Sequence, residues 1–140
     1  MGELCLTPDG QTMYCGGPEK WGDFQGKDIY VLHRNGTGWT APVALPSPIN
    51  TKEYNEDQPF VTPDGRELWF TGQSRLGYAG PAVFRCVMKA DGNWSDPEEI
   101  VSNFAGEPAL DAQGNLYFVH HFYTADGKMI EADIYVAYKK

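Results

Sequence analysis

Residues 57–101 read DQPFVTPDGRELWFTGQSRLGYAGPAVFRCVMKADGNWSDPEEIV, and this stretch decides the fold because it holds four strand-like runs in succession. The runs are, in order, 58–62, 66–71, 82–89 and one that opens at Trp94. Pro-Asp-Gly at 63–65 and Asp-Gly at 91–92 are residue combinations that favour tight turns between antiparallel strands. The stretch therefore predicts one four-stranded antiparallel sheet.

The segment before this stretch contains the same landmarks. Thr-Pro-Asp-Gly at 7–10 recurs at 62–65, and the Asn-Gly turn before Trp39 corresponds to the Asp-Gly turn before Trp94. Both landmarks shift by the same 55 positions. The agreement of two independent offsets indicates an internal repeat.

The segment after the stretch begins a third unit. The residues from Glu107 onwards match the first two runs in outline, and Asp-Ile-Tyr-Val occurs at both 28–31 and 133–136. A repeat period of about 40–55 residues with about four strands per repeat is typical of a β-propeller, in which each repeat forms one blade.

We therefore predict an all-β protein, a β-propeller segment of about three four-stranded blades within a single domain that spans 1–140. The three units cover 3–46, 57–101 and 107–140. The third unit contains only three runs, so the last blade is expected to lack a strand. Neighbouring large residues such as Trp69 and Phe70 point to opposite faces of a strand, so both faces of a blade need a cover.

The charge of the chain excludes two classes of partner. Its formal net charge is −8 and its basic residues are scattered, whereas nucleic acids and anionic membrane surfaces require a basic patch. No apolar stretch approaches the roughly 20 residues of a membrane span. The start MGELCLTPDG lacks the features of a signal peptide, so the sequence as written predicts a cytoplasmic protein.

The three cysteines, Cys5, Cys15 and Cys86, are predicted to be reduced, because the number is odd and a chain of this length can fold without disulfides. A three-residue hairpin loop at 8–10 would pair Thr7 with Gln11. Cys5 would then lie diagonal to Cys15, in a position that disfavours a disulfide.

The combination of Gln-Pro-Phe-Val-Thr-Pro-Asp-Gly at 58–65, Leu-Trp-Phe-Thr at 68–71 and the two Asp-Ile-Tyr-Val segments resembles the PD repeat of the TolB-type, WD-like β-propellers. The resemblance implies a ring of about six blades, of which this chain corresponds to the C-terminal three. It also implies a periplasmic location if the chain is part of an exported protein. That family includes scaffolds, sugar lyases and propellers that gate serine peptidases, so the fold alone does not select a function.

Several residue combinations come near a catalytic or metal-binding motif without matching it. Ser74 lies in Gly-x-Ser-x-x-Gly, which has one residue more than a nucleophile elbow and leads into a loop. His120 and His121 are neighbours on a predicted strand and point to opposite faces, so they do not share one metal site. Paired acids such as Glu98 and Glu99 are expected on a solvated edge. We predict no catalytic residue, no metal and no cofactor.

The connections after the second and fourth strands of each unit are mostly long, and strand alternation places them at one end of the blades. We predict a ligand surface there, built from six aromatic residues: Trp21, Phe24, Tyr54, Tyr78, Phe104 and Tyr123. Aromatic rings among carboxylates such as Asp126 suit a peptide of a partner protein or a glycan. The alternative is that these rings only pack the loops against one another.

The two end blades are expected to present apolar faces, because no further blade covers them. The residues expected there are Leu4, Leu6, Met13 and Tyr14 at one end, and Leu116, Tyr117, Phe118 and Ile134 at the other. Such faces predict a homo-oligomer, most simply a dimer that completes a six-blade ring, or association with missing blades. The expected function is a non-catalytic binding or scaffold module. The alternative is part of a sugar-processing or peptidase-associated propeller enzyme whose catalytic residues lie outside this chain.

Overall fold

The computed structural model describes residues 3–18 and 26–140, and these residues form strands and turns without a helix. Blade 1 contains β1 (Leu4–Leu6), β2 (Thr12–Pro18), β3 (Lys27–Asn35), β4 (Gly38–Trp39) and β5 (Val43–Ala44). Blade 2 contains β6 (Glu56–Val61), β7 (Glu67–Gln73), β8 (Pro81–Val87) and β9 (Glu98–Val101). Blade 3 contains β10 (Ala105–Leu110), β11 (Leu116–Tyr123) and β12 (Met129–Ala137).

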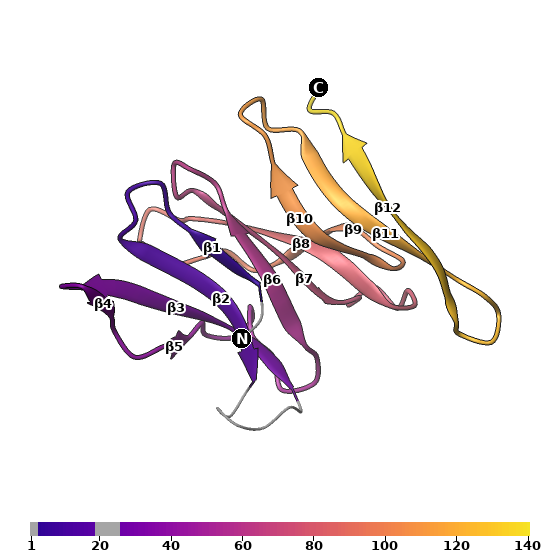
Figure 1. The fold of residues 1–140 in the computed structure, drawn as a ribbon, viewed down its shortest axis with the longest axis horizontal. Helices are drawn as coiled ribbons and strands as arrows, with labels where there is room; N and C mark the ends of the chain where they lie inside the picture. Colours follow the sequence, from indigo (N-terminus) through magenta and orange to yellow (C-terminus); the bar gives the residue numbers. More distant parts are fainter. Residues whose placement is uncertain (1–2, 19–25) are drawn as a thin grey trace.

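The three antiparallel sheets stand side by side in chain order, as Figure 1 shows. The first strand of each later blade makes the contact with the blade before it: β6 lies against β1, β2 and β3, and β10 lies against β6, β7 and β8. The chain is thus an all-β propeller segment of three blades whose last blade lacks a strand, as the sequence predicted.

The outer strands of blades 1 and 2 are both interrupted. In blade 1 the predicted outer strand is divided into β4 and β5, with Pro42 between them. In blade 2 Trp94 forms an isolated bridge with Met88, and β9 begins directly after Pro97. Proline lacks the N–H that a ladder requires, so a strand at the edge of a sheet is where it is tolerated.

The first hairpin has a different register from the one predicted. Leu4 pairs with Cys15 and Cys5 with Tyr14, so Thr7 lies opposite Thr12 instead of Gln11. The loop between them has four residues, 8–11, instead of the predicted three. The side chain of Thr7 is the physical reason, because its Oγ1 accepts the N–H of Thr12 at 3.0 Å. The three cysteines are free thiols, as predicted.

The same hydrogen bonds form at the second Thr-Pro-Asp-Gly turn. Thr62 Oγ1 accepts the N–H of Glu67 at 3.0 Å and donates to Asp64 at 2.6 Å, as Thr7 Oγ1 donates to Asp9 at 2.7 Å. A similar turn joins β11 to β12, where Thr124 Oγ1 accepts the N–H of Lys128 at 3.0 Å. β11 and β12 are therefore joined by a tight hairpin, although the connection after the second strand of this unit was predicted to be one of the long ones, and Asp126 belongs to the turn.

Alternating side chains of blade 2 fill two separate cores. Leu68 and Phe70 belong to the core shared with Ile29 of blade 1, whereas Trp69 belongs to the core shared with Leu116 of blade 3. Phe70 stacks on Phe84 with 5.3 Å between ring centroids. Blade 2 is thereby covered on both faces, as the neighbouring large residues of its strands predicted.

The inner strands of blades 2 and 3 each contain a bulge directly before a proline. Gln58 and Glu107 both have a positive φ, of 55° and 56°, and the pairing register shifts at each. The Gln58 side chain connects the blades, since its Oε1 accepts the N–H of Glu107 at 3.2 Å and its Nε2 donates to Glu3 at 3.3 Å. The bulge places this amide where it reaches both neighbouring blades.

The outward faces of the end blades only partly match the expectation. Leu4 and Leu6 are exposed in blade 1, and Tyr117 and Ile134 are exposed in blade 3. The expectation was wrong for three residues, because Tyr14 packs into the core between blades 1 and 2, and Leu116 and Phe118 pack toward blade 2.

Candidate functional site

The candidate site lies at the end of the blades where the connections 46–55 and 74–80 meet. Glu56, the first residue of β6, is fully buried at this end. Its carboxylate accepts the N–H of Thr51 at 3.1 Å and the hydroxyl of Thr51 at 2.9 Å. A buried carboxylate needs such partners, because removing an ion from water is costly unless it is paired and hydrogen-bonded.

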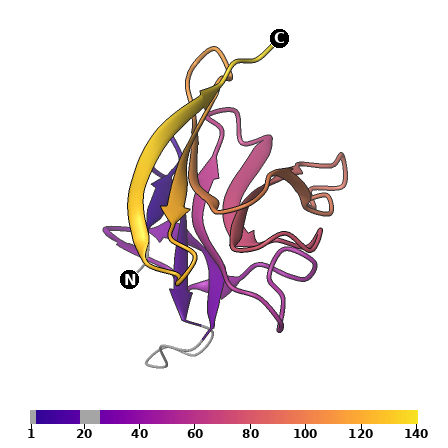
Figure 2. The same cartoon turned by 90° about the vertical axis from the view of Figure 1, so that its right-hand side faces the viewer.

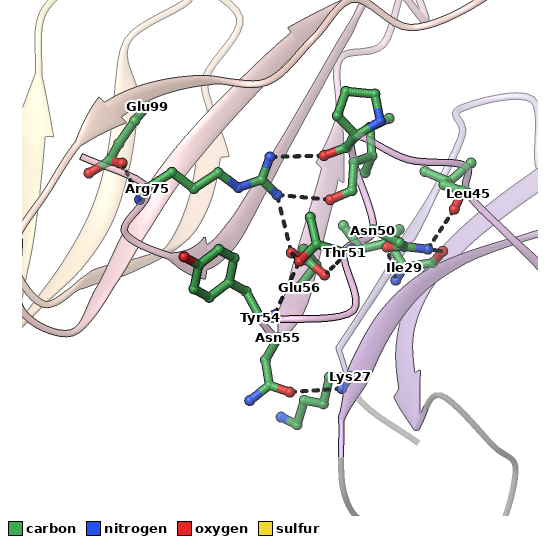
Figure 3. Close-up of polar contacts among 12 residues, drawn as sticks. Lys27, Ile29, Leu45, Asn50, Thr51, Tyr54, Asn55, Glu56, Arg75 and Glu99 are labelled. Carbon is green, nitrogen blue, oxygen red and sulfur yellow. Dashed lines mark hydrogen bonds and ion pairs between the residues drawn. The ribbon is translucent and has the colours of Figure 1, made fainter. Parts of the chain in front are cut away.

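Arg75 supplies the positive charge beside this carboxylate (Figure 3). Its Nη2 donates to Glu56 Oε1 at 3.1 Å and to the carbonyl of Ile49 at 3.0 Å, while Nη1 donates to the carbonyl of Pro48 at 2.8 Å. The guanidinium carbon also lies 4.9 Å from the ring centroid of Phe84. Arg75 therefore fastens the connection 46–55 to blade 2.

Burial raises the pKa of the Glu56 carboxyl above its usual range. The hydrogen bonds from Thr51 and the charge of Arg75 act in the opposite direction, because they favour the ionised form. They offset only part of the effect of burial. Both Thr51 and Arg75 therefore support the ionised state of Glu56.

Glu99 holds the second connection. Its carboxylate accepts the hydroxyls of Ser74 and Ser102 at 2.8 Å and 2.6 Å and the backbone N–H groups of Arg75 and Leu76 at 2.8 Å and 3.2 Å. Burial alone would raise the pKa of this carboxyl, but the four hydrogen bonds outweigh burial and lower it. Glu99 fixes the start of the connection 74–80, because it accepts hydrogen bonds from N–H and O–H groups that would otherwise have to bond to water.

Two exposed tyrosines are held by the same kind of contact. The N–H of Tyr54 donates to Thr51 Oγ1 at 3.2 Å, and that hydroxyl donates to Glu56. The N–H of Tyr78 donates to Ser74 Oγ at 3.3 Å, and that hydroxyl donates to Glu99. The backbone of each tyrosine is therefore anchored while its side chain stays exposed to solvent.

Asn50 attaches the connection 46–55 to blade 1 (Figure 3). Its Oδ1 accepts the N–H of Ile29 at 2.8 Å, and its Nδ2 donates to the carbonyls of Ile29 and Leu45 at 2.9 Å and 2.8 Å. Asn50 is buried, so these three bonds satisfy backbone groups that water does not reach. The connection is thus joined to blade 1 by Asn50 and to blade 2 by Glu56.

The six aromatic residues predicted for this end fall into three groups. Tyr54 and Tyr78 are exposed on the two connections. The ring of Phe104 packs beside Gly80, where a Cβ would overlap it, and its centroid lies 4.8 Å from that of Tyr123. Phe104 and Tyr123 thus make the packing contact that was the alternative interpretation, although Tyr123 is 40% exposed, about as much as Tyr54. Trp21 and Phe24 lie outside the described residues.

Arg75 and Glu99 were not predicted as members of the site, and the interpretation of Glu99 as part of a solvated edge was wrong. Glu98 beside it is exposed, so the expectation is correct for that residue. A signal was present in the sequence, because Arg75 is a cation inside a loop of a repeat that otherwise places apolar residues inward. Its partner Glu56 lies 19 positions earlier and could not be identified from spacing.

Both carboxylates of the site, Glu56 and Glu99, are occupied by donors from the protein itself. Each of the two carboxylates accepts several hydrogen bonds, and these bonds hold the two connections in place. Within 3–18 and 26–140, no three histidine, cysteine or acidic side chains are grouped as metal ligands. The same residues contain no helix of the length and apolarity that crossing a membrane requires. No protein-family model matches the chain, and no curated protein matches its sequence.

Proposed function

We propose that this protein is a non-catalytic binding module that holds an extended peptide segment of a partner protein. The binding surface, which we term the tyrosine surface, consists of Tyr54, Leu76 and Tyr78 on the two connections. The observation that supports the proposal is the anchoring of both tyrosine amides, through Thr51 and Ser74, to carboxylates that Arg75 joins. A binding surface gains affinity when its loops need no further ordering.

Three features favour a peptide over a glycan. Leu76 is 67% exposed at the tip of its connection, between the two tyrosines in the sequence, and such an aliphatic side chain suits an apolar peptide side chain. The carboxylates of Glu56 and Glu99 already have several donors each, so they offer little to sugar hydroxyls. The net charge of −8 favours a segment with positive charge, since opposite charge speeds encounter.

The proposed family is the TolB-type propellers. The paired Thr-Pro-Asp-Gly turns support this proposal, because Thr7 and Thr62 form the same set of hydrogen bonds. That family includes scaffold proteins, and both carboxylates of this site already accept hydrogen bonds from the protein itself. The proposal therefore assigns recognition, not chemistry, to this end of the blades.

The test uses selection from a peptide library displayed on phage, followed by titration of the selected peptide. The triple variant Y54A/L76A/Y78A should bind at least tenfold more weakly while its melting temperature stays within a few degrees of the parent. Tyr138→Ala is the control, because Tyr138 is an exposed tyrosine outside the two connections, in the C-terminal segment after β12. Undiminished binding by the triple variant would refute the site, and binding to a glycan array without any selected peptide would refute the ligand class.

A further inference from the structure

One face of blade 3 has apolar side chains at positions that are buried in the other two blades, but here these side chains are exposed to solvent. We term the face of a blade that is turned to the next blade in chain order its forward face. Ile29 and Val83 occupy equivalent positions of the repeat on the forward faces of blades 1 and 2, and both are 0% exposed. Ile134, at the equivalent position of blade 3, is 76% exposed.

The neighbouring strand of blade 3 shows the same difference. Trp69 on the forward face of blade 2 is 7% exposed, whereas Tyr117 at the equivalent position of β11 is 39% exposed. Val136 pairs with Tyr117, and Val119 pairs with Ile134, so all four side chains lie on one face of the sheet. Figure 2 shows this side of the molecule, with β12 in front and no described element across it.

The opposite end of the chain exposes the complementary face. Val61 of blade 2 points back to blade 1 and is 5% exposed, whereas Leu6 at the equivalent position of β1 is 46% exposed. Leu4 lies on the same face two residues earlier and is also exposed. Cys15 and Tyr30 on this face are already buried, so the free part of the face is centred on β1.

We propose that the forward face of blade 3 packs against the backward face of blade 1 of a second copy, and that two copies close a six-blade ring. The joint continues an interface that the chain forms twice within itself, between blades 1 and 2 and between blades 2 and 3. Each copy supplies one face of each kind. A joint between unlike faces forms a closed ring when the rotation per copy divides the circle, and a rotation of half a turn per copy closes the ring with two copies.

The second copy is favoured over an unrelated partner because the required surface is already present on this chain. An unrelated partner would need to reproduce the inward-facing residues of a propeller blade. The residues that this joint would bury are those that the repeat buries elsewhere, at Ile29, Val83, Trp69 and Val61. This proposal does not depend on the tyrosine surface, which lies on the connections rather than on the blade faces.

The experiment measures the mass of the purified chain in solution by sedimentation and native mass spectrometry. The protein concentration is varied over about a hundredfold range that starts at the detection limit. We expect twice the mass of the 140-residue chain. Ile134→Glu and Leu6→Glu should each give a folded monomer, because each places a charge in the joint on a side chain that is exposed within one copy. Leu76→Glu is the control, since Leu76 is exposed on a connection, and it should leave the mass doubled.

Mixing the two monomeric variants identifies which faces meet. L6E retains an intact forward face and I134E retains an intact backward face, so the mixture should recover a heterodimer joined through one interface. A joint between two identical faces would instead leave one of the single variants fully dimeric. A monomer throughout the concentration range, a dimer that persists in both variants, or a series of larger open assemblies would each overturn the proposal.

Discussion

Arg75 donates from Nη2 to Oε1 of the fully buried Glu56 at 3.1 Å, and the two side chains come from different elements, a loop after β7 and the start of β6. Glu56 accepts hydrogen bonds from Thr51, and the backbone N–H of Arg75 donates to Glu99. One ion pair thus connects the supports of both loops at this end of the blades. Its contribution can be measured directly.

Arg75→Leu should lower the free energy of unfolding by about 3 kcal/mol at neutral pH, because it leaves the Glu56 charge buried without a cation. Adding Glu56→Gln should recover part of this loss, since a neutral amide is less costly to bury than a carboxylate. The free energy of unfolding of each variant is measured by urea denaturation. Arg66→Ala is the control, because Arg66 is exposed, and it should change stability by less than about 0.5 kcal/mol. A double variant as unstable as R75L would show that charge burial is not the cause.

The loss in free energy of unfolding caused by Arg75→Leu should become smaller as the pH falls from 7 towards 4. Burial holds the pKa of Glu56 above its unfolded value of 4.5, so the stability linked to its protonated form is fully present below 4.5 and is lost as the pH rises through the folded pKa. Removing Arg75 enlarges this shift. The quantity to compare is the difference between variant and parent at each pH, and a deficit that stays constant would contradict the assignment.

Glu99 should show the opposite dependence on pH. Its folded pKa is lowered, so its contribution is fully present above 4.5 and is lost as the pH falls through the folded pKa. Glu99→Gln should cost about 1–3 kcal/mol at pH 7, with a difference from the parent that narrows below pH 4.5. The amides of Arg75 and Leu76 should also exchange hydrogen faster. Glu98→Gln is the matched control on the exposed neighbour, and an equal effect there would mean that general charge is responsible.

Asn50→Ala should cost more than about 2 kcal/mol, because it leaves the N–H of Ile29 and the carbonyl of Leu45 without their buried partner, while the carbonyl of Ile29 keeps the N–H of Leu45. Asn55→Ala is a useful comparison, since Asn55 accepts a single exposed N–H from Lys27 at 2.9 Å. That variant should lose less than about 1 kcal/mol. Equal losses in chemical denaturation would argue that Asn50 does not act as a substitute strand partner.

Thiol reactivity should separate the three cysteines. Cys15 and Cys86 are buried, and burial raises the pKa of Cys86 to about 12, so both should react slowly in the folded protein. Cys5 is only partly buried, although its Sγ accepts the N–H of Val61 at 3.3 Å, and it should react first. All three should react once the unreduced protein is unfolded. Titration with a coloured thiol reagent measures both states, and two missing thiols would indicate a disulfide.

The strands and their grouping into blades could be predicted from the sequence because their causes are local. Pro-Asp-Gly at 63–65 sets a turn by its own backbone preferences, and alternating residues such as Leu68 and Trp69 indicate a sheet covered on both faces. The register of the first hairpin was mispredicted for a reason that propensity does not include. The hydroxyl of Thr7 takes the place of a backbone partner and lengthens the loop by one residue.

The supports of the candidate site could not be predicted, because they join residues whose separation follows no period. Glu56 and Arg75 meet only when the connection 46–55 and the loop after β7 have folded. The left-handed backbone of Gln58 also lacks a local signal, since a residue before proline usually adopts an extended conformation. Tyr54, Tyr78 and Phe104 lie on the connections, whereas Tyr123 is the last residue of β11. Composition alone did not distinguish the exposed Tyr78 from the packed Phe104.

The prolines that interrupt the outer strands affect where aggregation of this protein can begin. Pro42 and Pro97 leave the outer edges of blades 1 and 2 without a continuous ladder that another chain could extend. Blade 3 has no such protection, because β12 runs uninterrupted for nine residues from Met129 to Ala137 and pairs only with β11 among the described strands. Growth of this protein into fibrils, under conditions that favour them, would therefore begin at the edge of β12.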